Sequence, residues 1–270
     1  MDKISPLKTN PVSQVLKSGY INLYSQLSSS ELRAIHYKEI YKVSNPTWDE
    51  TQVLLSKEFR KHFGGRGASV LDAGCGNGNF IIDENRAIIN WACGVDLKQD
   101  YTSKNVCLDE IKYAKLDANP YPDNSFDAVV SLWVVEHLDQ PLSVFKELYR
   151  VLKPNGLFLF ATPNKNYFPL LLNQFLTKSK LTETILQKVY GRQPEDVFKA
   201  FYKANTLEQL TLLAKQANFQ IEKLEYNYDP AYTSFNTLTY TLSSKLATFL
   251  ENRKCYLNTA HIVGIFKKKL

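Results

Sequence analysis

The stretch VLDAGCGNGNF, residues 70–80, decides the fold. Two apolar residues, Val70 and Leu71, lead into Asp72, and glycines follow at positions 74, 76 and 78. Glycine has no Cβ atom, so a loop with this spacing can bring its backbone close to a ligand. An apolar run followed by a glycine loop is typical of the first strand and turn in a nucleotide-binding α/β sheet.

The spacing of the glycines narrows the class of ligand. A dinucleotide loop of the type G-x-G-x-x-G/A would have a small residue where Asn79 stands, and a P-loop would need Gly-Lys-Ser/Thr, which is absent from this stretch. An NAD-dependent oxidoreductase is therefore the least favoured enzyme class. The pattern that remains is G-x-G-x-G behind Asp72, which suits another adenosine compound.

Apolar runs and a helical pattern alternate along the rest of the chain. Leu142–Leu152 has apolar residues at helical spacing and stops at a turn signal, Lys153–Gly156. Thr206 is typical of a residue that caps a helix, here over 207–217. The predicted strands are Ser69–Ala73, Ile88–Val95, Tyr113–Leu116, Asp127–Val135, Leu157–Ala161, Phe219–Tyr226 and His261–Phe266. This alternation predicts a parallel α/β sheet with helices on both faces.

We divide the chain into four parts on these patterns. Residues 1–66 form an N-terminal helical segment that covers the site, and 67–163 form the cofactor-binding core. Residues 164–205 break the strand–helix rhythm and are predicted to be a helical lid for the substrate. Residues 206–270 complete the α/β core, with a helical insertion near 232–252.

Acidic residues follow the predicted strands. Asp96 ends the second one and can accept hydrogen bonds from both hydroxyls of a ribose. Asp117 ends the third and can accept one from an adenine amino group. With Asp72, these carboxylates mark the edge of the sheet where open α/β folds bind ligands.

The segments VLDAGCGNGNF, GVD, LDANPYPDNSFDAVVSLWVVEHL and VLKPNGLFLFATP together resemble the class I S-adenosylmethionine-dependent methyltransferases. The similarity is strongest to the small-molecule branch that includes ubiquinone-biosynthesis enzymes, and it covers roughly residues 66–163. The resemblance implies a Rossmann-like three-layer sandwich whose seven-stranded, mostly parallel sheet has an antiparallel last strand, with a helical cap. It also implies S-adenosyl-L-methionine as the cofactor.

The resemblance assigns roles to individual residues. Asp72 and the glycine loop would hold the methionine end of the cofactor, Asp96 the ribose, and Leu97 would pack against the adenine. Asp117 would contact the adenine amino group beside Ala118, and Leu132 and Trp133 would form the floor near the reactive methyl. The implied cofactor-binding set is Asp72, Gly74, Cys75, Gly76, Asn77, Gly78, Asp96, Leu97, Asp117, Ala118, Leu132 and Trp133.

Methyl transfer from a sulfonium needs an aligned nucleophile and the exclusion of water. A hydroxyl acceptor also needs a base, and His137 after the fourth strand is the candidate; its alternative role is to fix the loop together with Glu136. Some relatives bind a metal through Glu-x-x-Glu-His. Trp133 occupies the first position of that run here, so no metal is expected.

The candidate substrate residues lie outside the core. They are either acceptor contacts or packing residues of a helical cap: His36, Tyr37, Arg192, Phe198, Tyr202 and Tyr232, with Lys199 as a further possible anion contact. We expect an acceptor that is a small molecule, anionic or lipid-like, and methylated on oxygen. Nitrogen or carbon methylation, RNA methylation and a non-catalytic cofactor-binding partner remain alternatives. The N/D-P-P-Y/F motif is missing after the fourth strand, so no nucleic-acid partner is expected.

Composition and charge agree with a folded enzyme. The 270 residues are 44% hydrophobic and 22% charged, which excludes collagen-like, disordered and disulfide-framework proteins. The four cysteines lie far apart, no signal peptide is evident, and no apolar run reaches the roughly twenty residues of a spanning helix, so we expect a cytoplasmic protein. Residues 69–163 carry eight Lys/Arg and thirteen Asp/Glu, an acidic centre that suits a cationic cofactor.

Overall fold

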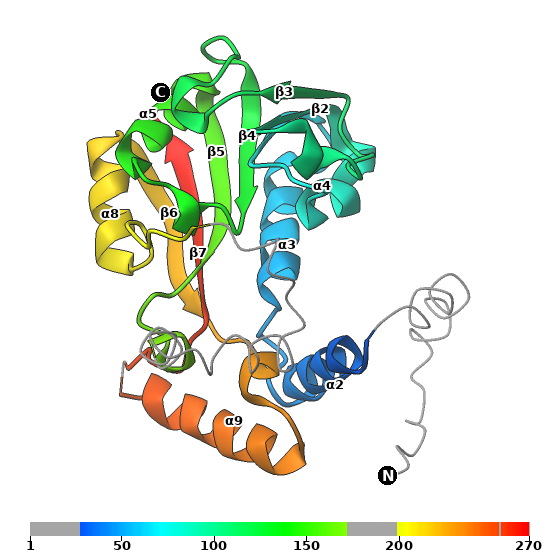
Figure 1. Ribbon diagram of the computed structural model, residues 1–270, viewed down its shortest axis with the longest axis vertical. Helices are drawn as coiled ribbons and strands as arrows, with labels where there is room; N and C mark the ends of the chain where they lie inside the picture. The colour runs from blue at the N-terminus through cyan, green and yellow to red at the C-terminus, as the bar shows by residue number, and fades with distance from the viewer. Residues whose placement is uncertain (1–27, 172–198, 254, 270) are drawn as a thin grey trace.

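A seven-stranded sheet with helices on both faces forms the body of the protein (Figure 1). The computed structural model describes residues 28–171, 199–253 and 255–269. The strands are β1 (Ala68–Ala73), β2 (Ile89–Asp96), β3 (Glu110–Tyr113), β4 (Phe126–Leu132), β5 (Leu152–Pro163), β6 (Phe219–Asn227) and β7 (His261–Lys268). Their order is β3-β2-β1-β4-β5-β7-β6, and β7 runs antiparallel to both neighbours, which confirms the predicted fold.

Two apolar layers hold the helices against the sheet. Alternate strand residues point to opposite faces, so Val70 joins one layer and Leu71 the other. The first layer packs under α3 (Thr51–Phe63) and α4 (Phe80–Asn85), and the second under α5 (Pro141–Val151) and α8 (Leu207–Gln216). Short 3₁₀ turns join these elements: η1 (Arg86–Ile88), η2 (Gln99–Thr102), η3 (Leu116–Ala118), η4 (Val135–His137) and η6 (Pro230–Thr233).

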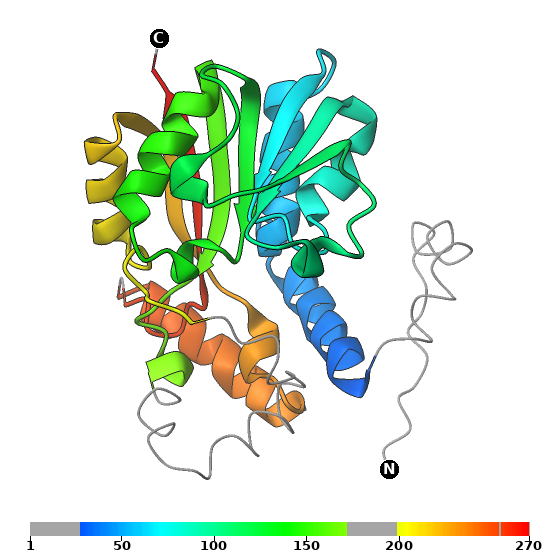
Figure 2. The same cartoon turned by 45° about the horizontal axis from the view of Figure 1, so that its top comes forward.

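Two further helices, α2 (Ser29–Ser44) and α9 (Thr237–Glu251), lie beyond the carboxyl ends of the parallel strands (Figures 1 and 2). We call these two helices and η6 the cap. Lys38 of α2 forms ion pairs of 3.2 Å with both Glu50 and Asp229, which join the cap to the core. Burial lowers the pKa of Lys38, but the two carboxylates outweigh burial, so the net pKa is raised.

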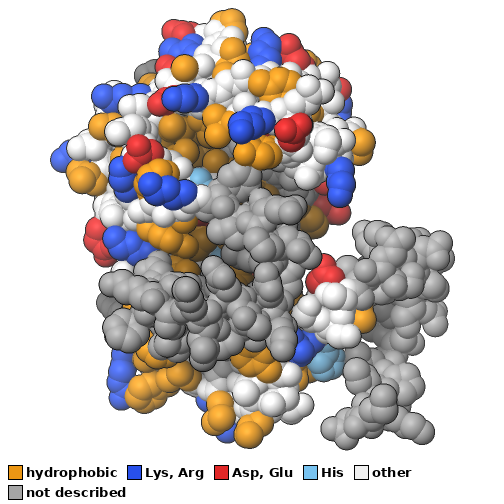
Figure 3. All heavy atoms as spheres, in the orientation of Figure 1, with side chains coloured by type: hydrophobic (Ala, Val, Ile, Leu, Met, Phe, Trp, Pro, Cys, Tyr) orange, Lys and Arg blue, Asp and Glu red, His pale blue; other side chains and the backbone are white. Residues whose placement is uncertain are grey.

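The surface of the cap includes apolar side chains. Leu238, Leu242, Leu246 and Phe249 of α9 are exposed, and orange side chains are visible at the lower end of the molecule in Figure 3. Within the described ranges, no helix has the length and apolar character needed to span a membrane.

The third strand lies earlier than the sequence predicts. It covers Glu110–Tyr113 instead of Tyr113–Leu116, so Asp117 does not end a strand and lies in η3. The reason is that β3 is an edge strand whose residues are only partly buried, and its alternating charged residues give a weak apolar signal. The predicted turn at Lys153–Gly156 lies inside β5, where the pairing with β4 is irregular and Asn155 has a φ of 64°.

The predicted lid, 164–205, is only described at its two ends, 164–171 and 199–205. Residues 199–205 pack against the turn after β4, because the amides of Phe201 and Tyr202 donate to the Glu136 carbonyl over 2.8 and 3.2 Å. In the C-terminal part, α9 lies within the stretch 232–252 for which a helical insertion is expected.

Gly264 of β7 provides a test of the core. A Cβ atom there would overlap the buried ring of Phe160 on the paired strand β5, so Gly264→Ala is expected to destabilise the fold by about 1–3 kcal/mol. Urea unfolding should show a lower midpoint with an unchanged slope. Phe160→Leu makes room for the new methyl group, so the double variant should lose less stability than the sum of the single losses. Strict additivity would contradict this explanation.

Candidate active site

The glycine loop, Gly74–Gly78, connects β1 to α4 and packs against the turn after β4. Gly74 has a φ of 79°, and a Cβ atom there would lie 2.5 Å from Cγ2 of Val134, so the close contact excludes a side chain. Beside Gly76 and Gly78 the space is more open, with only Tyr101 O at 4.0 Å and Asp83 Oδ2 at 3.8 Å from a built Cβ. The loop therefore presents bare backbone to this space.

Asp72, near the end of β1, carries a buried carboxylate that is only half satisfied. Its Oδ1 accepts a hydrogen bond of 2.8 Å from the Asn79 amide, whereas Oδ2 has no hydrogen-bond partner among the described residues. Asn79 also caps α4, because its Oδ1 accepts from Ile81 N. Burial raises the pKa of Asp72 to about 7, against the opposing effect of the Asn79 hydrogen bond. An unpaired buried carboxylate oxygen is a ready acceptor for a cationic group.

Asp96, the last residue of β2, is fixed by the glycine loop. Gly76 N donates to its Oδ2 over 2.9 Å, and Leu97 N donates to its Oδ1 over 2.6 Å. Each oxygen keeps a second lone pair for a ligand. Leu97 next to it is 59% exposed, so its side chain is available to cover a flat group.

The loop is also held from the side of η2. Asn77 Oδ1 accepts from Lys104 N over 3.0 Å, Asn105 donates to Gly76 O over 3.1 Å, and Cys75 is buried. Asp117 and Ala118 lie in η3, where both are exposed. The chain between β3 and η3 is tied to the site, because Ala114 N donates to Asp96 O over 2.9 Å.

Leu132 and Trp133 lie where β4 ends. Trp133 has a φ of 60°, an uncommon conformation for an aromatic residue, and its N–H donates to Ala161 O over 3.0 Å. Both side chains pack against the apolar layer under α3, and the Trp133 ring lies 4.6 Å from the ring of His261.

His137 closes η4 beside a buried acidic residue. Its Nδ1 lies 3.1 Å from the Lys199 carbonyl, and its Nε2 lies 3.9 Å from Glu136 Oε1. A carbonyl oxygen only accepts, so the proton of this bond belongs to Nδ1. Glu136 is in turn held by Thr162, whose hydroxyl donates to its Oε2 over 3.1 Å. Within the described part of the chain, no cluster of three or more His, Cys, Asp or Glu residues could hold a metal.

The predicted substrate residues fall into three groups. Tyr232 of η6 lies near the sheet edge, with its ring 5.3 Å from that of His261, and Tyr202 is tied to the Glu136 turn. Tyr37 is buried within the cap and stacks on Tyr240 of α9 at 5.0 Å, with His36 beside it. Arg192 and Phe198 lie outside the described residues.

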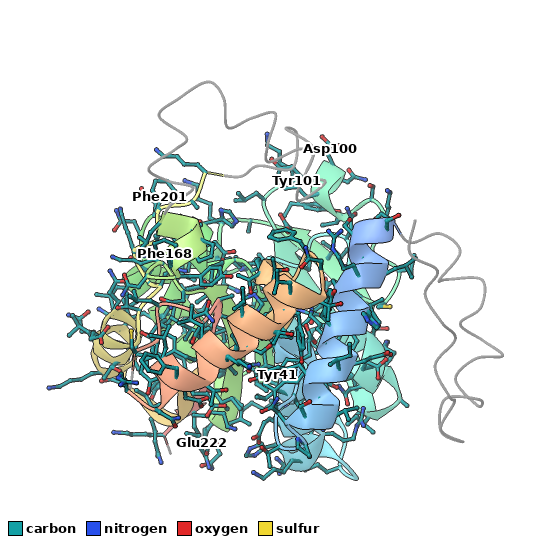
Figure 4. The ribbon with its side chains drawn as sticks, turned by 90° about the horizontal axis from the view of Figure 1, so that it is seen from below. Tyr41, Asp100, Tyr101, Phe168, Phe201 and Glu222 are labelled. Atoms are coloured by element: carbon teal, nitrogen blue, oxygen red, sulfur yellow. The ribbon has the colours of Figure 1, made fainter. Side chains whose placement is uncertain are left out.

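Figure 4 shows the carboxyl edge of the sheet from the side of the cap. Tyr101 and Asp100 of η2 lie at one side of this edge, and Phe168 and Phe201 lie at the other. Tyr41 lies between α2 and α9, away from these four residues.

Sequence reasoning missed three residues that meet at this edge. The Thr51 hydroxyl, at the start of α3, lies 2.9 Å from His261 Nδ1 and 3.1 Å from the amide nitrogen of Asn227 at the end of β6. His261 is a single polar residue at the start of an apolar strand, and this is the sequence feature that could have identified it as a site residue. Thr51 and Asn227 are separated from it by long stretches of chain and carry none.

The comparisons with known proteins agree with this geometry. Residues 71–160 match the family model described as "Methyltransferase domain". A probable S-adenosylmethionine-dependent methyltransferase from Mycolicibacterium smegmatis is 34% identical over 160 residues, which are 53% of this chain and 58% of that protein. The demethylmenaquinone methyltransferase of Staphylococcus aureus (strain JH9) is 25% identical over 168 residues, 59% of this chain and 70% of that protein.

A solved structure shows the same fold. The S-adenosylmethionine-dependent methyltransferase from Mesorhizobium loti superposes with a TM-score of 0.52 at 16% identity, over 79% of this chain and 97% of that one. The family match covers the glycine loop and the strands that carry Asp72 and Asp96. Residues 71–160 therefore form a methyltransferase domain that is similar to those of S-adenosylmethionine-dependent enzymes, whose cofactor is S-adenosyl-L-methionine.

Proposed function

We propose that the protein transfers the methyl group of S-adenosylmethionine to an oxygen atom of a small-molecule or lipid-precursor acceptor. The observation that carries the proposal is the buried, half-satisfied carboxylate of Asp72 beside the bare glycine loop. Both lie where the strand order reverses, between β1 and β4, and this is the place where open α/β sheets bind ligands.

The residues present fit this cofactor. Asp72 Oδ2 would accept from the α-ammonium group, the open face of the loop at Gly76 and Gly78 would lie against the methionine part, and the Asp96 carboxylate would accept from the ribose hydroxyls. When bound, S-adenosylmethionine supplies an electrophilic methyl group on a positively charged sulfur. The acidic residues of this region stabilise that charge.

The chain itself contributes alignment and a base. Nδ1–H of His137 is directed at the Lys199 carbonyl, so Nε2 is the ring nitrogen that would take a proton from an acceptor hydroxyl. The same contact ties residues 199–205 to the turn after β4, and this part of the predicted lid would help exclude water.

Aromatic side chains support a planar or lipid-like acceptor. The rings of Trp133 and Tyr232 lie 4.6 and 5.3 Å from the ring of His261, and Tyr167 lies 6.1 Å from Tyr232. The staphylococcal relative takes demethylmenaquinone, by its name. Nitrogen and carbon acceptors are the competing possibilities, and a panel of phenols, carboxylates and amines distinguishes them by the S-adenosylhomocysteine released.

Removing the Asp96 carboxylate tests the cofactor site. Asp96→Ala should weaken S-adenosylhomocysteine binding by about 10- to 100-fold in calorimetry, because hydrogen bonds to a charged group are lost. Asp100→Ala, an exposed carboxylate four residues away, is the matched control and should bind like the unaltered protein. NADH serves as the rival ligand. Tighter binding of NADH than of S-adenosylhomocysteine would contradict the proposal.

The raised pKa of Asp72 predicts that binding of S-adenosylhomocysteine depends on pH. Its raised pKa of about 7 means that the ligand-free carboxyl is protonated below neutral pH, whereas a bound ammonium group favours the ionised form. Binding should therefore release a proton, and affinity should increase between about pH 5 and pH 7 and level off above, while the ligand's amino group stays protonated.

The control for this prediction is Asp72→Asn, which keeps the side-chain oxygen that faces Asn79. It should bind more weakly at pH 8 and lose the rise in affinity below pH 7. Calorimetry in buffers of different ionisation enthalpy counts the protons released. An unchanged rise in the Asn variant would assign the titration to another group.

His137 is tested with the first hydroxyl acceptor that the panel yields. His137→Ala should lower kcat by about 100- to 10,000-fold, because the base that takes the hydroxyl proton is lost, with cofactor binding unchanged. His62→Ala, on the outer side of α3 near Glu222, is the control and should leave kcat unchanged. If the acceptor is already anionic, both variants should retain activity, and His137 would be a loop-fixing residue.

A further inference from the structure

Among the described residues, one ring nitrogen of His261, the first residue of β7, has a hydrogen-bond partner and the other has none. The side chain is 3% exposed, Nδ1 lies 2.9 Å from the Thr51 hydroxyl, and Nε2 has no hydrogen-bond partner in the described part of the chain. A buried polar atom without a partner costs free energy, so its presence in a folded protein calls for an explanation.

The neighbouring bonds decide which nitrogen carries the proton. The Asn227 amide nitrogen donates to Asp49 O over 3.0 Å and to Thr51 Oγ1 over 3.1 Å, and an amide NH₂ can only donate. The hydroxyl proton of Thr51 is then free to go to His261 Nδ1. This arrangement leaves a single unpaired group, Nε2–H. The other tautomer would leave two, the Thr51 hydroxyl proton and the Nε2 lone pair.

The ring is therefore a neutral donor and not an acid or base. Burial, together with the charge of Lys38, lowers the pKa of His261 to about 3, against the opposing effect of Glu50. Asp229 is the other charged group of this cluster, through its ion pair with Lys38. Across the pH range from 5 to 8 the donor is present without a change of charge.

The His261 ring lies close to the turn that contacts the glycine loop. His261 pairs with Pro163 and Asn227, at the carboxyl ends of β5 and β6. Its ring lies between those of Trp133 and Tyr232, at 4.6 and 5.3 Å. Trp133 is followed by Val134, the residue that contacts Gly74 of the loop. The His261 ring is thus linked to the glycine loop through Trp133 and its neighbour Val134.

We propose that Nε2–H of His261 donates a hydrogen bond to an oxygen of the methyl acceptor, and that this acceptor carries a carbonyl or phenolic oxygen on a planar group. This inference rests on the proposed function and specifies its substrate class. A neutral donor fixed by Thr51 and Asn227 favours such an oxygen over an ammonium or an alkyl group, because these cannot accept the bond.

Nitrogen NMR of the histidine rings tests the donor directly. The chain has four histidines, so ¹⁵N-histidine labelling gives few signals, and His261→Gln assigns the relevant one. We expect the neutral tautomer with its proton on Nε2 between pH 5 and pH 8. Thr51→Val, which removes the hydroxyl, should shift the ring toward the other tautomer. A proton on Nδ1 in the unaltered protein, or a charged ring at pH 7, would overturn the inference.

Phenol is the probe for the oxygen site, and toluene, with a methyl group in place of the hydroxyl, is its matched control. Phenol added to the complex with S-adenosylhomocysteine should shift the Nε2–H signal, and toluene should not. His261→Leu should weaken phenol binding by about tenfold and leave toluene binding unchanged, and His261→Gln should restore part of the difference. Phenol that leaves Nε2–H unshifted, or binds the Leu variant equally well, would overturn the proposal.

The proposed function and the hydrogen-bond donor at His261 can be disproved separately. Loss of S-adenosylhomocysteine binding by the unaltered, folded protein would count against the proposed function. If S-adenosylhomocysteine binds normally but phenol does not shift the Nε2–H signal of His261, only the donor site is disproved. If His261→Leu does not fold, the tautomer of His261 in the unaltered protein and its change in Thr51→Val still test whether Nε2–H is the donor.

Discussion

The contact between Gly74 and Val134 is the constraint on which the rest of the site depends. It joins the loop after β1 to the turn after β4, between the two strands where the order of the sheet reverses, and it leaves no space for a side chain at position 74. Trp133 directly precedes Val134, and its indole ring lies 4.6 Å from the ring of His261. The left-handed backbone of Trp133 belongs to this arrangement.

Two polar networks meet at the edge of the sheet. One joins Asp72 to Asn79 and Asp96 to the glycine loop, and it concentrates negative charge where a cationic ligand is expected. The other runs from Asp49 through Asn227 and Thr51 to His261 and ends in an uncharged donor. In the proposed function, the cofactor is recognised by charge, with a raised carboxyl pKa at Asp72, and the acceptor by the direction of a single hydrogen bond.

The sequence was sufficient wherever the signal is local. The loop from Val70 to Phe80 combines strand, turn and helix signals within eleven residues, so its structure and the position of Asp72 follow directly. The edge strand β3 was misplaced because half-exposed residues carry little periodic signal, and Asp117 lost its predicted place at a strand end with it. His261 could not be identified as part of the site, because its meaning depends on Thr51, 210 positions away.

Among the described residues, the two networks share no hydrogen bond and no side chain. The first belongs to β1, β2 and the turns that follow them, whereas the second uses Asp49 and the ends of α3, β6 and β7. If the second network binds the acceptor as proposed, substitutions at the ends of these three elements can change the acceptor and leave the residues proposed to hold the methyl donor intact. Such a separation of two networks would allow related proteins with the same fold to methylate different compounds, because one network could change during evolution while the other stays the same.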